Sequence, residues 1–159
     1  MTKKLAIILV CISFVFITSC GKKAPPRAPN IIIPNPAKEL SAHAAKQGVV
    51  LLEFKLPKKN GDGSAFDDLK AILVFRAAVS DMNSFCPSCD ESYEMIYNGP
   101  ATIINDIVKF TDWTATEKNE LEAYVYKVKV ANSSYNRRRY NRGLSGFSAP
   151  VKVSVNTDK

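Results

Sequence analysis

The chain has 159 residues, of which 46% are hydrophobic, and 22 lysines and arginines against 15 aspartates and glutamates give it a net charge of +7. This length supports one domain with its own hydrophobic core. A single histidine, His43, excludes the many catalytic and metal-binding schemes that need several imidazole groups. No set of Ser, His and Asp residues suggests a hydrolase, so we expect a protein that is not an enzyme and needs no cofactor.

The first nineteen residues predict an export signal. Lys3 and Lys4 form a basic start, and the apolar run that follows, residues 5–17, is thirteen residues long. A helix that spans a bilayer needs roughly 20 apolar residues, so this run is too short to remain as a membrane span. A cleaved signal peptide over residues 1–19 fits the pattern better.

The stretch ITSC that ends at Cys20 resembles the lipobox of bacterial lipoproteins, in which an aliphatic residue and two small residues precede the cysteine that receives lipid. The resemblance implies that the mature protein begins at Cys20 and carries two or three acyl chains, palmitate among them. At ~0.8 kcal/mol per buried methylene group, two or more chains anchor a protein durably. Gly21 follows, and not the Asp that retains such proteins at the inner membrane, which implies the outer membrane.

Removal of the signal leaves a net charge near +5. Mild basicity beside a membrane favours anionic lipid, lipopolysaccharide or another polyanion as the neighbour. Another envelope protein is the alternative partner, and we expect no nucleic acid. The segment 22–36 holds five prolines, which favour an extended backbone of ~3.1 Å per residue. We therefore expect residues 20–33 to form a lipidated N-terminus and a semi-rigid linker, with one domain over residues 34–156.

In that domain strand signals repeat and helix signals do not. Strands are predicted at residues 49–56, 70–79, 93–99, 106–113, 123–131 and 149–155. The second of these, KAILVFRAAV, is predicted to be buried on both faces. In AYVYKVKVA the apolar residues alternate with Lys127 and Lys129, which predicts a half-buried strand. Six or seven strands without a helix indicate an all-β antiparallel sandwich.

The segment PNPAKELSAHAAKQGVVLLEFKLP resembles the opening of a fibronectin type III domain. Pro36 stands before strand A, Leu40 is the inward leucine, and Phe54 replaces the usual core tryptophan of strand B. FTDWTATEKNELEAYVYKVKVAN resembles the passage from strand E to strand F, in which Asp112 ends strand E and Tyr124 is the corner tyrosine whose hydroxyl binds backbone across the turn.

GLSGFSAPVKV resembles the start of strand G, with Ser148 and Pro150 at the usual positions. The whole resemblance implies an immunoglobulin-like, fibronectin type III-like sandwich with insertions near residues 80–92 and 100–107. It also implies a domain that binds or spaces and does not catalyse, although the fold alone names no ligand.

The sequence CPSC contains Cys86 and Cys89, the two cysteines that remain after Cys20 is acylated. In an oxidising compartment an isolated pair predicts a disulfide that stiffens the first insertion. Two alternatives stay open. A thioredoxin-like redox centre or a zinc site would make the chain a redox or metal-handling envelope protein that acts through these two thiols.

The sequence NRRRYNR, residues 136–142, falls in the predicted loop between strands F and G. Its four arginines are Arg137, Arg138, Arg139 and Arg142. Guanidinium groups bind phosphate and carboxylate groups bidentately, so the loop is a candidate anion-binding site for lipopolysaccharide, anionic lipid or an acidic polymer. A solvated hairpin is the alternative. We expect, in sum, a lipid-anchored outer-membrane protein with a binding or scaffolding domain.

Overall fold

The computed structural model describes residues 31–45, 48–115, 121–136 and 142–154. The chain divides into two compact units, Met1–Asn30 and Ile31–Lys159, and every described residue belongs to the second. The predicted signal peptide, Cys20 and the arginines at 137–139 lie outside the described residues. The described residues form no helix of the length and hydropathy that crossing a bilayer requires.

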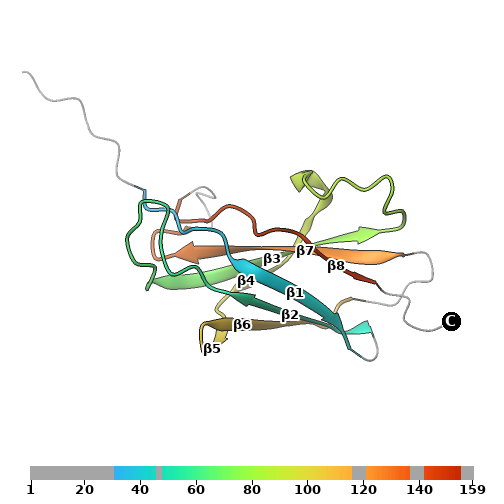
Figure 1. The fold of residues 1–159 in the computed structure, drawn as a ribbon, viewed down its shortest axis with the longest axis horizontal. Coiled ribbons are helices and arrows are strands. Elements are labelled where there is room, and N and C mark those ends of the chain that lie inside the picture. Colours follow the sequence, from blue (N-terminus) through green and yellow to red (C-terminus); the bar gives the residue numbers. More distant parts are fainter. Residues whose placement is uncertain (1–30, 46–47, 116–120, 137–141, 155–159) are drawn as a thin grey trace, which may run out of the picture. The chain divides into compact units, whose positions relative to one another are not determined.

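The second unit is an all-β sandwich of two antiparallel sheets, as the sequence predicts (Figure 1). One sheet has the order β1 (Lys38–Ala44), β2 (Val50–Lys55), β6 (Ile107–Asp112) and β5 (Thr102–Ile104). The other has the order β4 (Glu94–Gly99), β3 (Leu69–Val79), β7 (Ala123–Asn132) and β8 (Val151–Ser154). A single turn of 3-10 helix, η3 (Asp90–Ser92), precedes β4.

The six strands predicted from hydrophobic patterning lie within two residues of β2, β3, β4, β6, β7 and β8. β1 occupies the segment that the resemblance assigns to strand A. The segment 100–107, predicted to be an insertion, contains β5, which pairs with β6. Asn105 and Asp106 make the tight turn between them with φ angles of 51° and 64°. These two residue types tolerate the left-handed conformation best after glycine.

The main core fills the space between the two sheets. Leu52 and Phe54 of β2 meet the inward side chains of β7, Tyr126 and Val128 among them, and all four are almost fully buried. Phe54 therefore fills the position at which the resemblance expects tryptophan. Period-two alternation along β2 and β7 places these side chains on the inner faces.

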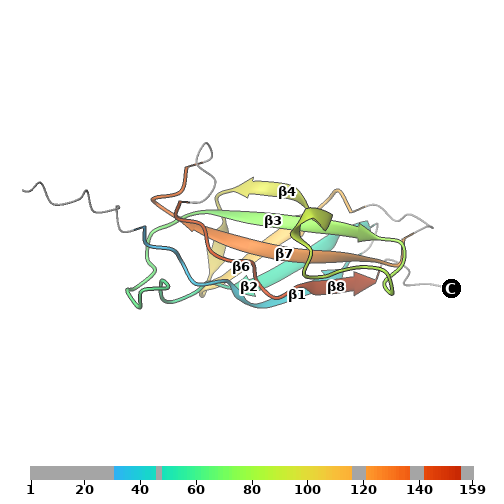
Figure 2. The same ribbon diagram turned by 90° about the horizontal axis from the view of Figure 1, so that it is seen from above.

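A second core covers the outer face of β3 and β7. Leu73, Phe75 and Val125 pack there against Tyr93 and Phe147. The insertion over residues 80–92 and the segment before β8 both run across this face (Figure 2). β3 is therefore buried on both faces, as predicted, but the prediction that β7 is half-buried was wrong.

The segment before β8 is held to β7 by serine side chains. The Ser145 and Ser148 hydroxyls accept the backbone N–H groups of Val130 and Val128 at 2.9 and 3.0 Å. The two serine N–H groups donate to the carbonyl oxygens of the same valines, both at 2.9 Å. Each hydroxyl thus replaces a ladder carbonyl, and the strand edge stays satisfied although the segment is not a regular strand.

One end of the sandwich, which we name the linker end, is the end at which residue 31 lies (Figure 1). The Ile32 carbonyl accepts a hydrogen bond from Asn132 Nδ2 at 2.9 Å, and the Ile33 carbonyl accepts one from the Gly61 N–H at 2.8 Å. The linker end therefore contains the end of β7, the 56–68 loop and the β5–β6 turn. Trp113 follows β6 and the insertion at 80–92 follows β3, and both of these strands end at the opposite end of the sandwich.

Candidate functional site

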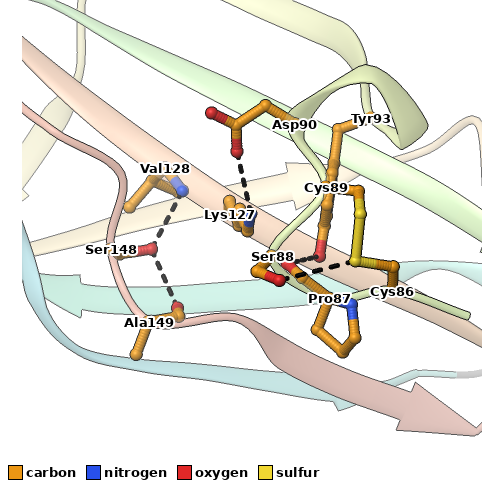
Figure 3. Close-up of polar contacts among 10 residues, drawn as sticks. All are labelled: Cys86, Pro87, Ser88, Cys89, Asp90, Tyr93, Lys127, Val128, Ser148 and Ala149. Atoms are coloured by element: carbon orange, nitrogen blue, oxygen red, sulfur yellow. Dashed lines mark hydrogen bonds and ion pairs between the residues drawn. A yellow bond between two sulfur atoms is a disulfide. The ribbon is translucent and has the colours of Figure 1, made fainter.

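Cys86 and Cys89 form a disulfide with their Cα atoms 5.4 Å apart, which confirms the predicted bond (Figure 3). The Cys89 N–H donates to the Cys86 carbonyl at 3.1 Å, so the bond closes a tight turn. η3 follows this turn directly, and the Ser92 N–H donates to the Cys89 carbonyl at 3.2 Å. The disulfide therefore fixes the path of the insertion across the outer face of β7.

The insertion buries Lys127, which sequence patterning placed in solvent. The Lys127 ammonium lies 3.1 Å from the Asp90 carboxylate and 4.3 Å from the centre of the Tyr93 ring. Its side chain is 5% exposed, whereas that of Asp90 is 62% exposed. A buried ammonium needs a carboxylate and other favourable groups to offset its lost hydration, and the ring face supplies a cation–π contact.

Tyr93 lies beside this ion pair, with the face of its ring towards Lys127 (Figure 3). Its hydroxyl donates to the Pro87 carbonyl at 3.0 Å, within the turn that the disulfide closes. Burial, and then the negative charge of Asp90, raise the pKa of Tyr93 to about 12. The tyrosine therefore stays neutral and keeps its donor for the turn at any physiological pH.

Lys129 extends the same arrangement along β7, with its ammonium 3.8 Å from the centre of the Phe147 ring. Burial lowers the pKa of Lys129, the charge of Asp90 opposes this, and the neighbouring Lys127 lowers it further. Two lysines thus flank Phe147 and pack it against the sheet. Their role is to build the second core around alkyl stems and aromatic faces.

An open groove of about 490 Å³ lies beside this cluster. It is lined by Pro87, Ser88, Asp90, Lys127, Phe147, Ser148 and Pro150. The Ser148 hydroxyl is already occupied by the Val128 N–H, and the Lys127 ammonium by Asp90. Among the described residues no three His, Cys, Asp or Glu side chains are grouped so that they could hold a metal ion.

Removal of the disulfide by Cys86→Ser and Cys89→Ser together is expected to leave the fold intact. The loop that the bond closes has about four residues, for which chain entropy gives only ~2 kcal/mol of stabilisation. Urea unfolding should therefore show a loss of about that size, with faster proteolysis within residues 80–92. Loss of the cooperative transition would contradict a local role, and a free thiol in the unreduced native protein would contradict the bond.

A buried carboxylate, Asp112, ties the two sheets together at the end of β6. It is 2% exposed and accepts hydrogen bonds from the Thr114 N–H and Oγ1, both at 2.8 Å. Arg76 of β3 donates to it at 2.8 Å, and the Tyr126 hydroxyl of β7 donates at 3.0 Å. Burial would raise the pKa of Asp112, but the Thr114 hydrogen bonds, the Arg76 charge and the Tyr126 hydroxyl together lower it.

Asp112 is the last residue of β6, which agrees with its predicted place at the end of a strand, and the corner hydroxyl was predicted to be that of Tyr124. That role of Tyr124 stays a prediction. The hydroxyl seen to join β7 to β6 is that of Tyr126, while the Tyr124 ring lies 5.0 Å from the Arg76 guanidinium. The ion pair itself was missed. An arginine within the apolar run of β3 was the available signal, because a guanidinium buried in a strand needs an anionic partner.

The base of the arginine-rich loop is fixed at the linker end. The Asn132 N–H donates to the Gly143 carbonyl at 2.9 Å, and the Tyr135 N–H donates to the Asn132 carbonyl at 3.0 Å. Lys70 Nζ donates to the Tyr135 carbonyl at 3.0 Å. Arg142, the one arginine of the cluster among the described residues, is half-buried beside this frame.

Beside the same base lies a polar hollow of about 460 Å³, lined by Lys70, Asn98, Tyr135 and Asn136 together with residues 71 and 99–100. Asn98 Nδ2 donates to the Tyr135 hydroxyl at 2.8 Å, which joins β4 to the base of the loop. The structure thus brings Arg142 and a polar hollow to one end of the sandwich. It places the disulfide with Lys127 elsewhere, on the outer face of β7.

No protein-family model and no curated protein matches this sequence. Among solved structures, "Titin kinase and its flanking domains" matches with a TM-score of 0.50 and 15% identity, covering 77% of this chain and 17% of that one. "Crystal structure of domains A168-A170 from titin" matches with a TM-score of 0.48 and 16% identity, covering 77% and 32%. "Cytokine receptor complex - Crystal form 1A" matches with a TM-score of 0.48 and 12% identity, covering 79% and 53%.

This chain therefore spans about a sixth of the length of the first of these structures. At such identity the likeness concerns the fold alone. It supports the immunoglobulin-like, fibronectin type III-like sandwich that the sequence predicts.

Proposed function

We propose that this chain is a lipid-anchored protein of the cell envelope whose sandwich domain serves binding or scaffolding. In this proposal Cys20 carries the acyl chains, the outer membrane is the site of anchoring, and residues 136–142 contact an anionic envelope component. Lipopolysaccharide and anionic phospholipid share the phosphate chemistry that arginine forks recognise.

The position of Asn136 and Arg142 carries this proposal. Both ends of the arginine-rich loop lie at the linker end, because Asn132 donates to the Gly143 carbonyl, accepts the Tyr135 N–H at its own carbonyl and donates through Nδ2 to the Ile32 carbonyl. Cys20 precedes Ile31 by eleven residues, and a proline-rich linker of that length spans ~34 Å when extended. A domain tethered on so short a linker keeps its linker end within reach of the lipid headgroups.

Substitution of the four arginines by alanine is expected to weaken binding to anionic vesicles or lipopolysaccharide by about tenfold or more, because charge-assisted hydrogen bonds contribute roughly 1.5–3 kcal/mol each before solvent screening. The binding should be measured by flotation or surface plasmon resonance at low and physiological salt. The protein for this assay carries Cys20→Ser, so that acyl chains do not dominate the binding.

A matched pair of variants separates the loop from net charge. Arg137→Ala with Arg138→Ala removes two positive charges from the loop, and Lys109→Ala with Lys152→Ala removes two from exposed positions on β6 and β8. We expect the arginine pair to cost several-fold more affinity than the lysine pair. Equal losses would reduce the effect to overall charge, and unchanged binding in the four-arginine variant would end the proposed contact.

A further inference from the structure

We infer that the linker end is a membrane-docking surface whose exposed isoleucines insert into the bilayer that holds the acyl chains of Cys20. This inference rests on the proposed lipid anchor and adds to it a second, protein-made contact with lipid. The occupant is the acyl-chain and glycerol layer of the membrane, not a second protein.

Exposed large apolar side chains are concentrated at this end. Among the described residues seven such side chains are exposed, and they are Ile31, Ile32, Ile33, Met95, Ile103, Ile104 and Trp113. The five isoleucines all lie at the linker end, and Ile104 is 54% exposed. Isolated exposed apolar residues need no explanation, but a group of them at one end marks an interaction surface.

The two groups of isoleucines are joined through the same loop. The Ile33 carbonyl accepts the Gly61 N–H at 2.8 Å, which attaches the first group to the 56–68 loop. Lys58 of that loop lines one hollow together with Ile103, and the Leu56 N–H donates to the Asp106 carbonyl of the β5–β6 turn at 3.2 Å. The isoleucines therefore border one continuous surface.

Lysines surround this surface, but its charge nearly balances. The described basic residues here are Lys38, Lys55, Lys58, Lys59, Lys70 and Arg142, and the acidic ones are Glu39, Asp62, Asp67, Asp68 and Asp106. Lys55 is paired with Glu39 at 2.5 Å. Because the positive and negative charges nearly cancel, these described residues must be held at the bilayer by insertion of apolar side chains and not by charge attraction. The lysine side chains around them can extend their ammonium groups to the lipid headgroups.

The short linker between Cys20 and Ile31 favours lipid as the partner of this surface. Ile31 is the first described residue after the linker, and the predicted acylated cysteine stands only eleven residues before it. A short tether makes contact between this end and the membrane effectively intramolecular, so even weak insertion is populated. A surface at the opposite end, such as that of Trp113, has no such advantage.

Trp113 is the only tryptophan of the chain and is 76% exposed, so it serves as a built-in probe of the opposite end. The full-length acylated protein is reconstituted into vesicles of phosphatidylcholine whose acyl chains are brominated, which quenches tryptophan fluorescence within the bilayer. Two probe variants carry Trp113→Phe together with Ile104→Trp or, as the matched control, Met95→Trp on β4. Circular dichroism confirms that each variant is folded.

We expect quenching to be several-fold greater for the Ile104→Trp variant than for either the Met95→Trp variant or the native protein, and to persist at high salt. Equal quenching at all three positions, in protein that floats with the vesicles, would overturn docking and leave the anchor intact. Quenching that requires phosphatidylglycerol and disappears in salt would assign the contact to the arginines and overturn apolar insertion. Protein without fatty acid on Cys20 would overturn the anchor, and docking with it.

Discussion

Replacement of Asp112 by alanine is expected to lower the free energy of unfolding by about 3–5 kcal/mol, because removal of one member of a buried ion pair leaves the other uncompensated. The Arg76 side chain is 15% exposed and would keep only Thr114 Oγ1, at 2.9 Å, as a described hydrogen-bond partner. The Tyr126 hydroxyl, also buried, would lose its acceptor. Urea or guanidinium unfolding of the purified domain measures the loss.

Tyr126→Phe is the matched control for this prediction. It removes one neutral donor from the same carboxylate and is expected to cost about 0.5–1.5 kcal/mol. A loss for Asp112→Ala no larger than that for Tyr126→Phe would show that the Arg76–Asp112 pair does not hold the sheets together.

The Asp112 effect should depend on pH in one direction. Its native pKa lies below the unfolded value of about 3.9, so the folded protein binds the proton less readily than the unfolded chain. The contribution of the ionised group is therefore complete above the unfolded pKa and disappears as pH falls through the lowered native pKa. The difference in stability between the native protein and Asp112→Asn should shrink below about pH 4. A difference that grows in acid would contradict the assigned network.

Replacement of Gly143 by alanine is expected to cost roughly 2–4 kcal/mol, from left-handed backbone strain and overpacking together. Gly143 has a φ angle of 68°, and an added Cβ would overlap Asn132 Oδ1 and would stand 2.7 Å from the Tyr135 nitrogen. Those atoms form the base of the arginine-rich loop, so the change should also weaken anion binding by displacing that loop.

Gly63→Ala provides the control for Gly143. Gly63 also has a positive φ, 88°, but an added Cβ there would meet no atom within 4 Å. It should lose only the backbone term, about 1–2 kcal/mol. Thermal or urea unfolding of both variants compares them directly, and equal losses would show that crowding at Gly143 plays no part.

The strands could be predicted because their residues alternate or form short apolar runs bounded by turn residues. β5 could not, because its three residues, Thr102–Ile104, are all exposed and too few to show a period. The burial of Lys127 could not be predicted from the sequence either. The segment that covers its side chain is a polar insertion, whose path depends on one disulfide and on Tyr93. Alternation along β7 reports which side of the sheet a residue takes, but not what covers that side.

The candidate sites divide in the same way. The disulfide of Cys86 with Cys89 and the arginine cluster of 136–142 could be predicted from residue types alone, because the residues of each set are close together in the sequence. The Arg76–Asp112 pair and the exposed isoleucines of the linker end join segments more than thirty residues apart. Only the packing of the two sheets against each other, and of the loops at the linker end, brings such residues together.

The lipid anchor is tested most directly by mass spectrometry of the mature N-terminus, on protein isolated from the membrane fraction of the cell that makes it. We expect an N-terminal peptide that begins at Cys20 and carries a thioether-linked diacylglycerol, while the Cys20→Ala variant leaves the membrane fraction. An N-terminus at another residue, or a Cys20 without fatty acid in protein that stays soluble, would contradict it.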